Sequence, residues 1–215
     1  QGVSSAASDV YKRQGERLSI DDGHVLYSHP NLNEIGQLAN LVKLARYDTK
    51  VFFNSNVHIN QTNICVLACK FCAFRRSKRQ SDAYELSLDN YLLEMDKYAN
   101  LVDEIHSVGG LHPDWRIEHY EQLITAAKDR YPNIAIKALT AVEIKHLSKQ
   151  SDISYNQTLR RLKAAGLDCL PGGGAEILND DVRAVICYGK ESSDEYLEIH
   201  RQAHSIGIPS NCTCL

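Results

Sequence analysis

The sequence lacks any long hydrophobic run and any excess of charge of one sign. The longest apolar stretch without a charge covers residues 64–69, far short of the ~20 residues that a membrane-spanning helix needs. Lysine and arginine number 24 against 27 aspartates and glutamates, which gives a net charge of −3. We therefore expect a cytoplasmic protein that has no membrane span and binds no nucleic acid.

The chain also has too few cysteines to be a small protein held together by disulfides. Seven cysteines occur in 215 residues, of which 43% are hydrophobic and 24% charged. This composition is typical of a globular domain and excludes a disordered chain. The length fits one domain or a piece of a larger one.

The two ends of the sequence differ from the rest. Residues 3–14 (VSSAASDVYKRQ) show neither helical nor strand periodicity, resemble read-through from a cloning adapter, and precede the only methionine, Met95. We expect residues 1–15 to be a non-native or disordered tail. Residues 16–215 are expected to be a fragment of one domain, because the sequence stops in the middle of a predicted strand.

Short stretches of strand character alternate with stretches of helical periodicity. Runs of strand type predict strands at 57–62, 104–108, 134–139, 167–170 and 208–213. Apolar residues three and four apart predict helices at 33–47, 88–98, 115–131, 141–149, 154–165 and 193–206. Strands separated by helices are typical of parallel βα units.

This alternation fits either an open doubly wound sheet or a β/α barrel. The loops with unusual chemistry follow the carboxyl ends of predicted strands: a cysteine cluster, then Gly109 and Gly110, then residues 171–174 (PGGG). Because β/α barrels build their active sites from such loops, we predict the α/β class and a partial TIM-type barrel. About five or six βα units would be present, with the C-terminal units missing.

Three cysteines lie close together in the pattern C-x3-C-x2-C, at Cys65, Cys69 and Cys72. Structural zinc sites usually take four protein ligands, and ordinary four-iron clusters take four thiolates. Three thiolates can hold three corners of a four-iron cluster and leave one iron open to a small molecule. The cluster of cysteines therefore predicts a metal site in which one position is free.

With Phe71 before the third cysteine, this segment resembles the signature of the radical S-adenosylmethionine (SAM) enzymes. Further segments narrow the resemblance to the aminofutalosine synthases of the futalosine route to menaquinone. These segments are residues 63–74, 106–114, 137–144, 170–177 and 198–211. The resemblance covers roughly residues 16–211 and identifies the fold as a radical SAM barrel.

The resemblance implies a [4Fe-4S] cluster held by the three cysteines, with SAM bound at the open iron. An electron from the cluster would cleave SAM to methionine and a 5′-deoxyadenosyl radical. That radical would add to 3-[(1-carboxyvinyl)oxy]benzoate, and the product aminofutalosine would form with loss of bicarbonate. SAM would be consumed as a co-substrate, and an electron donor such as flavodoxin or ferredoxin would be a partner.

Two alternatives stay open. The sister enzyme of the same pathway, cyclic dehypoxanthinyl futalosine synthase, shares the cysteines and the PGGGAE segment. A non-catalytic module is the alternative of another class, and would hold zinc or an iron-sulfur group through the three cysteines and a histidine such as His58.

The resemblance also implies which residues contact the cofactors. Gly109 and Gly110 correspond to the position that contacts the amino group of SAM, although a tight turn would explain two glycines equally well. Glu176 is a candidate for the ribose hydroxyls or for proton transfer. The predicted cofactor-binding residues are Phe71, Gly109, Gly110, Gly172, Gly173 and Glu176.

The substrate carries two carboxylates, and basic residues are candidates to bind them. Arg75 lies next to the cluster and could bind a carboxylate through two hydrogen bonds. Lys137 lies on a predicted strand and points either inward to an anion or outward to solvent. His112 either reaches SAM or substrate or belongs to the cap of the next helix. Glu176 and His112 are the predicted catalytic residues.

Overall fold

The computed structural model describes residues 17–214, so the tail predicted at residues 1–15 lies outside the described residues. The chain divides into two compact units, one up to Phe53 and one from Asn54 onward. Within the described range, no helix is long and apolar enough to cross a membrane.

The described part of the first unit contains two helices. Helix α2 spans Ile20–Tyr27 and begins at a capping box between Ser19 and Asp22. Helix α3 spans Leu32–Tyr47 and confirms the helix predicted at 33–47. Helix α2 was not predicted, because its eight residues are too few for a clear apolar period. Neither helix has a buried residue.

The second unit is built on a parallel sheet. Strands β1 (Asn56–His58), β2 (Glu104–Ser107) and β3 (Ala135–Ala138) pair in the order β1-β2-β3. Parallel bridges between Lys137 and Cys169 and between Leu170 and Ser210 continue the pairing. The strands predicted at 167–170 and 208–213 are therefore present only as single bridges, and β1 ends four residues earlier than predicted.

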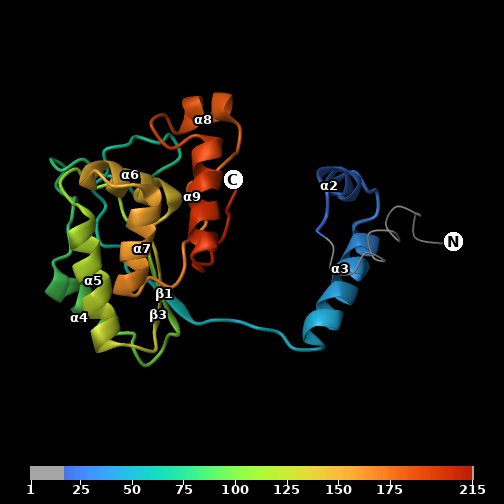
Figure 1. Cartoon of the computed structure of the whole chain (residues 1–215), viewed down its shortest axis with the longest axis horizontal. Coiled ribbons are helices and arrows are strands. Elements are labelled where there is room, and N and C mark those ends of the chain that lie inside the picture. Colours follow the sequence, from blue (N-terminus) through green and yellow to red (C-terminus); the bar gives the residue numbers. More distant parts are fainter. Residues whose placement is uncertain (1–16, 215) are drawn as a thin grey trace. The chain divides into compact units, whose positions relative to one another are not determined.

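Helices follow the strands in the predicted order (Figure 1). They are α4 (Leu88–Asp96), α5 (Ile117–Arg130), α6 (Ala141–Ser151), α7 (Tyr155–Ala165), α8 (Asp180–Ile186) and α9 (Ser193–Ser205). Helices α5, α6, α7 and α9 pack against one another. Five of these helices confirm predictions to within a few residues, and only the seven-residue α8 was not predicted. The α/β class and the parallel arrangement are confirmed.

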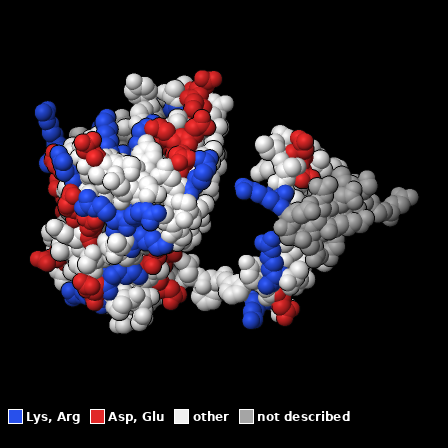
Figure 2. Space-filling model, viewed as in Figure 1, with Lys and Arg blue, Asp and Glu red and all other residues white. Residues whose placement is uncertain are grey.

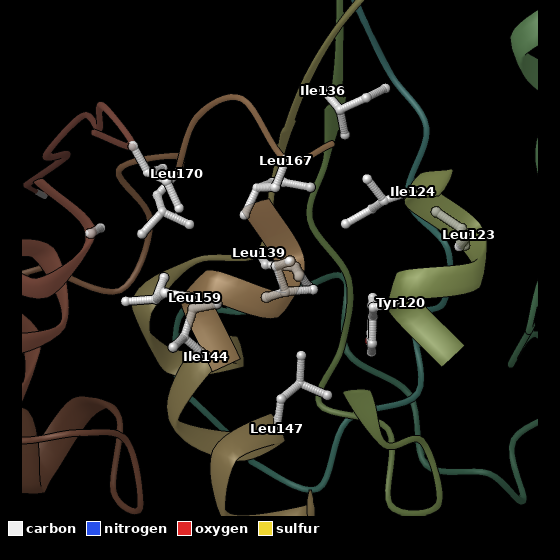
Figure 3. Packing of buried hydrophobic residues seen from close by; sticks show 14 of the residues in the cluster. Tyr120, Leu123, Ile124, Ile136, Leu139, Ile144, Leu147, Leu159, Leu167 and Leu170 are labelled. Atoms are coloured by element: carbon white, nitrogen blue, oxygen red, sulfur yellow. The ribbon is translucent and has the colours of Figure 1, made fainter. Parts of the chain in front are cut away.

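The hydrophobic core lies between the sheet and these helices (Figure 3). Ile105 and Ile136 pair across β2 and β3 and are both fully buried. Helix α5 buries Tyr120 and Ile124 against the same core. Side chains alternate between the two faces of a strand, so the neighbours of these isoleucines, such as Lys137, lie on the opposite face.

Truncation of the central core residue should be costly. Ile136→Ala removes a fully buried side chain, and we expect the free energy of unfolding to fall by about 2–4 kcal/mol because a cavity is left. Urea denaturation measures this change. Leu93→Ala on α4 is the control, since Leu93 is 56% exposed and should change stability by no more than about 0.5 kcal/mol. Equal effects of the two substitutions would contradict the core assignment.

Candidate functional site

The loops at the carboxyl ends of the strands enclose one cavity of about 210 Å³. The loop after β1 contributes the three cysteines, the loop after β2 contributes the two glycines, and the segment after residue 170 contributes the glycine-rich turn. The predicted site residues in its lining are Cys65, Cys69, Phe71, Cys72, Arg75, Gly109, Gly110, Gly173 and Glu176. Folding thus brings together residues that are up to 111 positions apart.

Backbone hydrogen bonds fix the cysteine-bearing loop to its surroundings. The amide of Cys65 donates to the carbonyl of Arg76 (3.0 Å), and the amide of Val66 donates to the carbonyl of Leu111 (3.0 Å). The amide of Lys70 donates to the carbonyl of Ile186 at 2.8 Å. The loop is therefore tied at both sides of Cys69, which positions the thiols before anything binds.

The three thiols fit an iron-sulfur cluster better than a single ion. All three cysteines are free and line the same cavity. In the part of the chain that the structure describes, no three His, Cys, Asp or Glu side chains converge as ligands of one metal ion must. A cluster does not need this convergence, because each thiolate binds a different iron.

His58 does not supply a fourth ligand. Its ring lies on β1 against the ring of His106, with 4.3 Å between centroids, and it is not part of the cavity lining. The arrangement that would hold zinc through the cysteines and His58 is therefore not formed.

Gly110 permits the close approach of two loops. A Cβ atom at this position would collide with the backbone carbonyl of Ile64, directly before Cys65. The amide of Gly110 also donates to the carbonyl of Thr62 at 2.9 Å. Whatever it contacts when a ligand is bound, Gly110 has a packing role that only glycine can fill.

Gly172 lies outside the cavity lining. A Cβ atom on Gly172 would come within 2.8 Å of the amide nitrogen of Thr213, whose N–H donates to the Gly172 carbonyl at 3.0 Å. Its role in the structure is to pack against the last chain segment, whereas its neighbour Gly173 faces the cavity. The predicted contact of Gly172 with cofactor thus has no support from its position.

Glu176 is held in the cavity by an ion pair that the sequence analysis did not identify. The ammonium of Lys190 lies 2.6 Å from the Glu176 carboxylate and 5.3 Å from the centroid of the Phe71 ring. Burial disfavours the ammonium, but the hydrogen bond and charge of Glu176 outweigh it and raise the pKa of Lys190. No motif surrounds Lys190, so only the fold could reveal it.

Arg183 fixes the glycine-rich turn from behind. This buried guanidinium donates to the carbonyls of Gly174 (3.0 Å) and Ala175 (2.6 Å), and to the carbonyl (2.7 Å) and side chain (3.1 Å) of Glu191. The turn needs such support because Glu176 has a φ of 49°, which is unfavourable for a residue with a side chain. Arg183 belongs to α8, the short helix that was not predicted.

Glu143 joins two of the loops that line the cavity. Its carboxylate accepts hydrogen bonds from the amide of Gly109 (3.0 Å) and from the amide and hydroxyl of Thr140 (both 2.7 Å). Burial raises the pKa of Glu143 to about 7, although these hydrogen bonds oppose the shift. Glu143 therefore positions Gly109 without lining the cavity itself.

Arg75 is the one predicted substrate-binding residue in the lining, where its Nε donates to the carbonyl of Cys65 at 3.4 Å. The neighbouring cations do not form an uncompensated basic patch. Arg76 pairs with Asp82 at 2.6 Å and Lys78 with Asp114 at 2.8 Å. Figure 2 likewise shows acidic side chains among the basic ones on the face in view.

His112 lies outside the cavity lining and is only 2% exposed. Its ring stacks on Trp115, its Nδ1 accepts a hydrogen bond from the amide of Asp114 (3.1 Å), and its Nε2 is 3.1 Å from Glu85. These contacts give it a structural place near the start of α5. Its predicted contact with SAM or substrate has no support in this geometry.

Comparison with known proteins decides the family. Residues 59–215 match the sequence model of the radical SAM superfamily. The chain belongs to the radical SAM superfamily. The superfamily implies SAM and an iron-sulfur cluster, and the chain is thus part of an enzyme, which excludes the non-catalytic zinc module.

Among curated proteins, this radical SAM chain is similar to enzymes of the futalosine pathway. It is 41% identical over 203 residues to the aminodeoxyfutalosine synthase of Thermus thermophilus, with 94% of this chain and 55% of the relative covered. It is 35% identical over 206 residues to the cyclic dehypoxanthine futalosine synthase of Streptomyces coelicolor, with 94% and 52% covered. The chain spans about half the length of the curated relatives it matches.

Solved structures support the fold of this radical SAM chain. HydG, a maturase of the [FeFe]-hydrogenase, has a TM-score of 0.77 at 16% identity and covers 100% of this chain and 47% of that one. Methylornithine synthase has a TM-score of 0.66 at 17% identity and covers 96% of this chain and 57% of that one. The predicted fold class, a partial radical SAM domain, is confirmed.

Glu143 should make stability depend on pH. Its pKa is raised from 4.5 to about 7 in the folded chain, so the folded state holds this proton more tightly than the unfolded state. The contribution of Glu143 to the free energy of unfolding should therefore be fully present below pH 4.5 and fall by up to about 3 kcal/mol as the pH rises through 7. Urea denaturation between pH 4.5 and 8 should show a flatter profile for Glu143→Gln than for the wild type.

Glu94→Gln is the matched control, because it makes the same change at an exposed salt bridge with Lys97. Its pH profile should follow the wild type. A Glu143→Gln profile as steep as that of the wild type would contradict the raised pKa.

Loss of Arg183 should loosen the glycine-rich turn. Arg183→Met leaves buried carbonyls and the Glu191 carboxylate without a donor, and we expect stability to fall by about 3–5 kcal/mol. Hydrogen exchange should also become faster at Gly174 and Ala175. Arg160→Met is the control, since Arg160 is exposed and, among the described residues, its side chain bonds to Asn156 alone. Unchanged exchange at the turn would show that Arg183 does not hold it.

Proposed function

We propose that this chain carries the cofactor-binding half of an aminofutalosine synthase. The observation that supports it most strongly is the meeting of Cys65, Cys69 and Cys72 with two glycine-containing loops around one cavity. The proposed reaction joins SAM, as a co-substrate, to 3-[(1-carboxyvinyl)oxy]benzoate. The similarity to aminodeoxyfutalosine synthases supports this choice of reaction.

The three cysteines would hold a [4Fe-4S] cluster and leave one iron open. When bound, such a cluster supplies the electron that cleaves SAM, and flavodoxin or ferredoxin is the proposed donor. Phe71 and Leu67 line the same cavity and would keep water away from the cluster. The loop that bears the cysteines is fixed by backbone bonds, so the thiols need little rearrangement.

Gly109, Gly173 and Glu176 are the proposed SAM contacts. Backbone at the two glycines can approach a ligand closely because no side chain intervenes. Glu176 would accept hydrogen bonds from the ribose hydroxyls, and the ion pair with Lys190 would hold its carboxylate in the cavity. Lys190 is therefore a positioning residue in this proposal.

Arg75 is the proposed contact for a substrate carboxylate within the cavity. Its Nε already bonds to the Cys65 carbonyl, which leaves its terminal nitrogens available for an anion. His112 is proposed to support the loop after Gly110 through its stacking on Trp115.

A second candidate is the cyclic dehypoxanthine futalosine synthase reaction, which the 35% identity over 206 residues favours as an alternative. The fate of SAM separates the two. With SAM labelled in its adenosine part, the first reaction carries the label into the product together with the substrate skeleton. The second releases it as 5′-deoxyadenosine.

Iron content tests the proposed cysteine site. After anaerobic reconstitution with iron and sulfide, we expect about four iron atoms per wild-type chain and a large loss in Cys65→Ala, Cys69→Ala and Cys72→Ala. Cys187→Ala is the matched control, because Cys187 is a buried free thiol outside the cavity lining, and it should keep the full iron content. Equal iron in all four variants would contradict the site.

A further inference from the structure

The sheet has a row of titratable side chains on the face opposite to the hydrophobic core. In the parallel register, His58 pairs with His106, His106 with Lys137, and Lys137 with Cys169. Residues in one register row of a parallel sheet point to the same side. The preceding row is Val57, Ile105 and Ile136, and the two isoleucines are fully buried against the helices.

The members of this row are close in space. The rings of His58 and His106 are 4.3 Å apart. Burial raises the pKa of the Cys169 thiol, and the positive charge of Lys137, its bridge partner on the neighbouring strand, opposes this shift. Burial, His58 and Lys137 lower the pKa of His106 to about 4, so this ring is neutral at pH 7.

Lys137 forms an ion pair with Glu104, but within the described part of the chain neither its ammonium nor Nε2 of His106 makes a hydrogen bond. The nearest acid to the Lys137 ammonium is Glu104, at 3.7 Å, which is longer than a hydrogen bond. The Nε2 atom of His106 is buried and has no hydrogen-bond partner. An ammonium with three N–H groups and a neighbouring imidazole with an unpaired nitrogen together suit an incoming carboxylate.

The row does not line the cofactor cavity itself but lies two to three residues before cavity-lining positions along the chain. Val108 lines the cavity and follows His106 by two residues, and Thr140 lines it and follows Lys137 by three. Two residues of a strand span about 6–7 Å. A ligand that reaches down from the cavity along this face would therefore meet His106 and Lys137 next.

We propose that His106 and Lys137 form a carboxylate-binding subsite one step below the cofactor cavity. The subsite deepens the proposed function: it would hold the aromatic carboxylate of the substrate while the reacting part lies near the cofactor. Only the identity of that ligand rests on the proposed function, because the two donors without a hydrogen bond belong to the chain itself.

Benzoate is the probe, and benzamide is its uncharged counterpart of the same shape. We expect the 215-residue chain to bind benzoate at least about tenfold more tightly than benzamide in calorimetric titrations. Lys137→Met should remove this preference, and Lys137→Arg should keep it because the positive charge is retained. Lys149→Met is the control, since Lys149 is exposed on α6, and it should bind both probes like the wild type.

Benzoate should also shift the ring signals of His106 in the nuclear magnetic resonance spectrum of the wild-type chain, whereas benzamide should not. The signals are assigned by their loss in His106→Phe. This measurement needs no folded Lys137 variant. Absence of the shift, or equal binding of benzoate by wild type and Lys137→Met, would overturn the subsite.

The outcomes distinguish the subsite from the proposed function. If benzoate binds through Lys137 but the chain takes up no iron, the subsite stands and the proposed function fails. If the chain takes up iron and its spectrum responds to SAM, but benzoate binds without Lys137, the proposed function stands and the subsite fails.

Discussion

Parallel pairing in a common register is the constraint on which the rest of this structure depends. The pairs Ile105 with Ile136 and His106 with Lys137 set one face of the sheet against the helices and leave the other face polar. The same pairing brings the carboxyl ends of all strands to one edge. Cysteines and glycines that are far apart in the sequence therefore meet around one cavity.

Buried charged residues then hold the loops at that edge in place. Glu143 ties Gly109 to the start of α6, and Arg183 binds the carbonyls of the glycine-rich turn. Neither residue lines the cavity, so both act on the site through the loops. The cavity lining can therefore consist mainly of small and apolar residues, because the charged residues Glu143 and Arg183 hold its loops from outside the lining.

Most of the predicted site residues line the same cavity because the strongest signal in the sequence is local. The spacing of Cys65, Cys69 and Cys72 and the neighbouring glycines needs no tertiary information. Lys190 and Arg183 could not be found this way, because their partners are set by how the turn folds over α8. His112 follows Gly109 and Gly110 closely in the sequence, which suggested a place in the site, but its ring stacks on Trp115 instead of facing the cavity. Similarly, the segments 167–170 and 208–213 have the apolar pattern of strands, but each pairs with its neighbours only through single bridges.

In the proposed site, three thiols at one cavity leave one iron open to SAM. Low-temperature electron paramagnetic resonance of the anaerobically reconstituted, dithionite-reduced chain, recorded with and without SAM, tests it most directly. The account predicts a four-iron signal whose shape changes when SAM is added. A folded chain that forms the cluster but gives the same spectrum with and without SAM, or that binds zinc in place of iron, would contradict it.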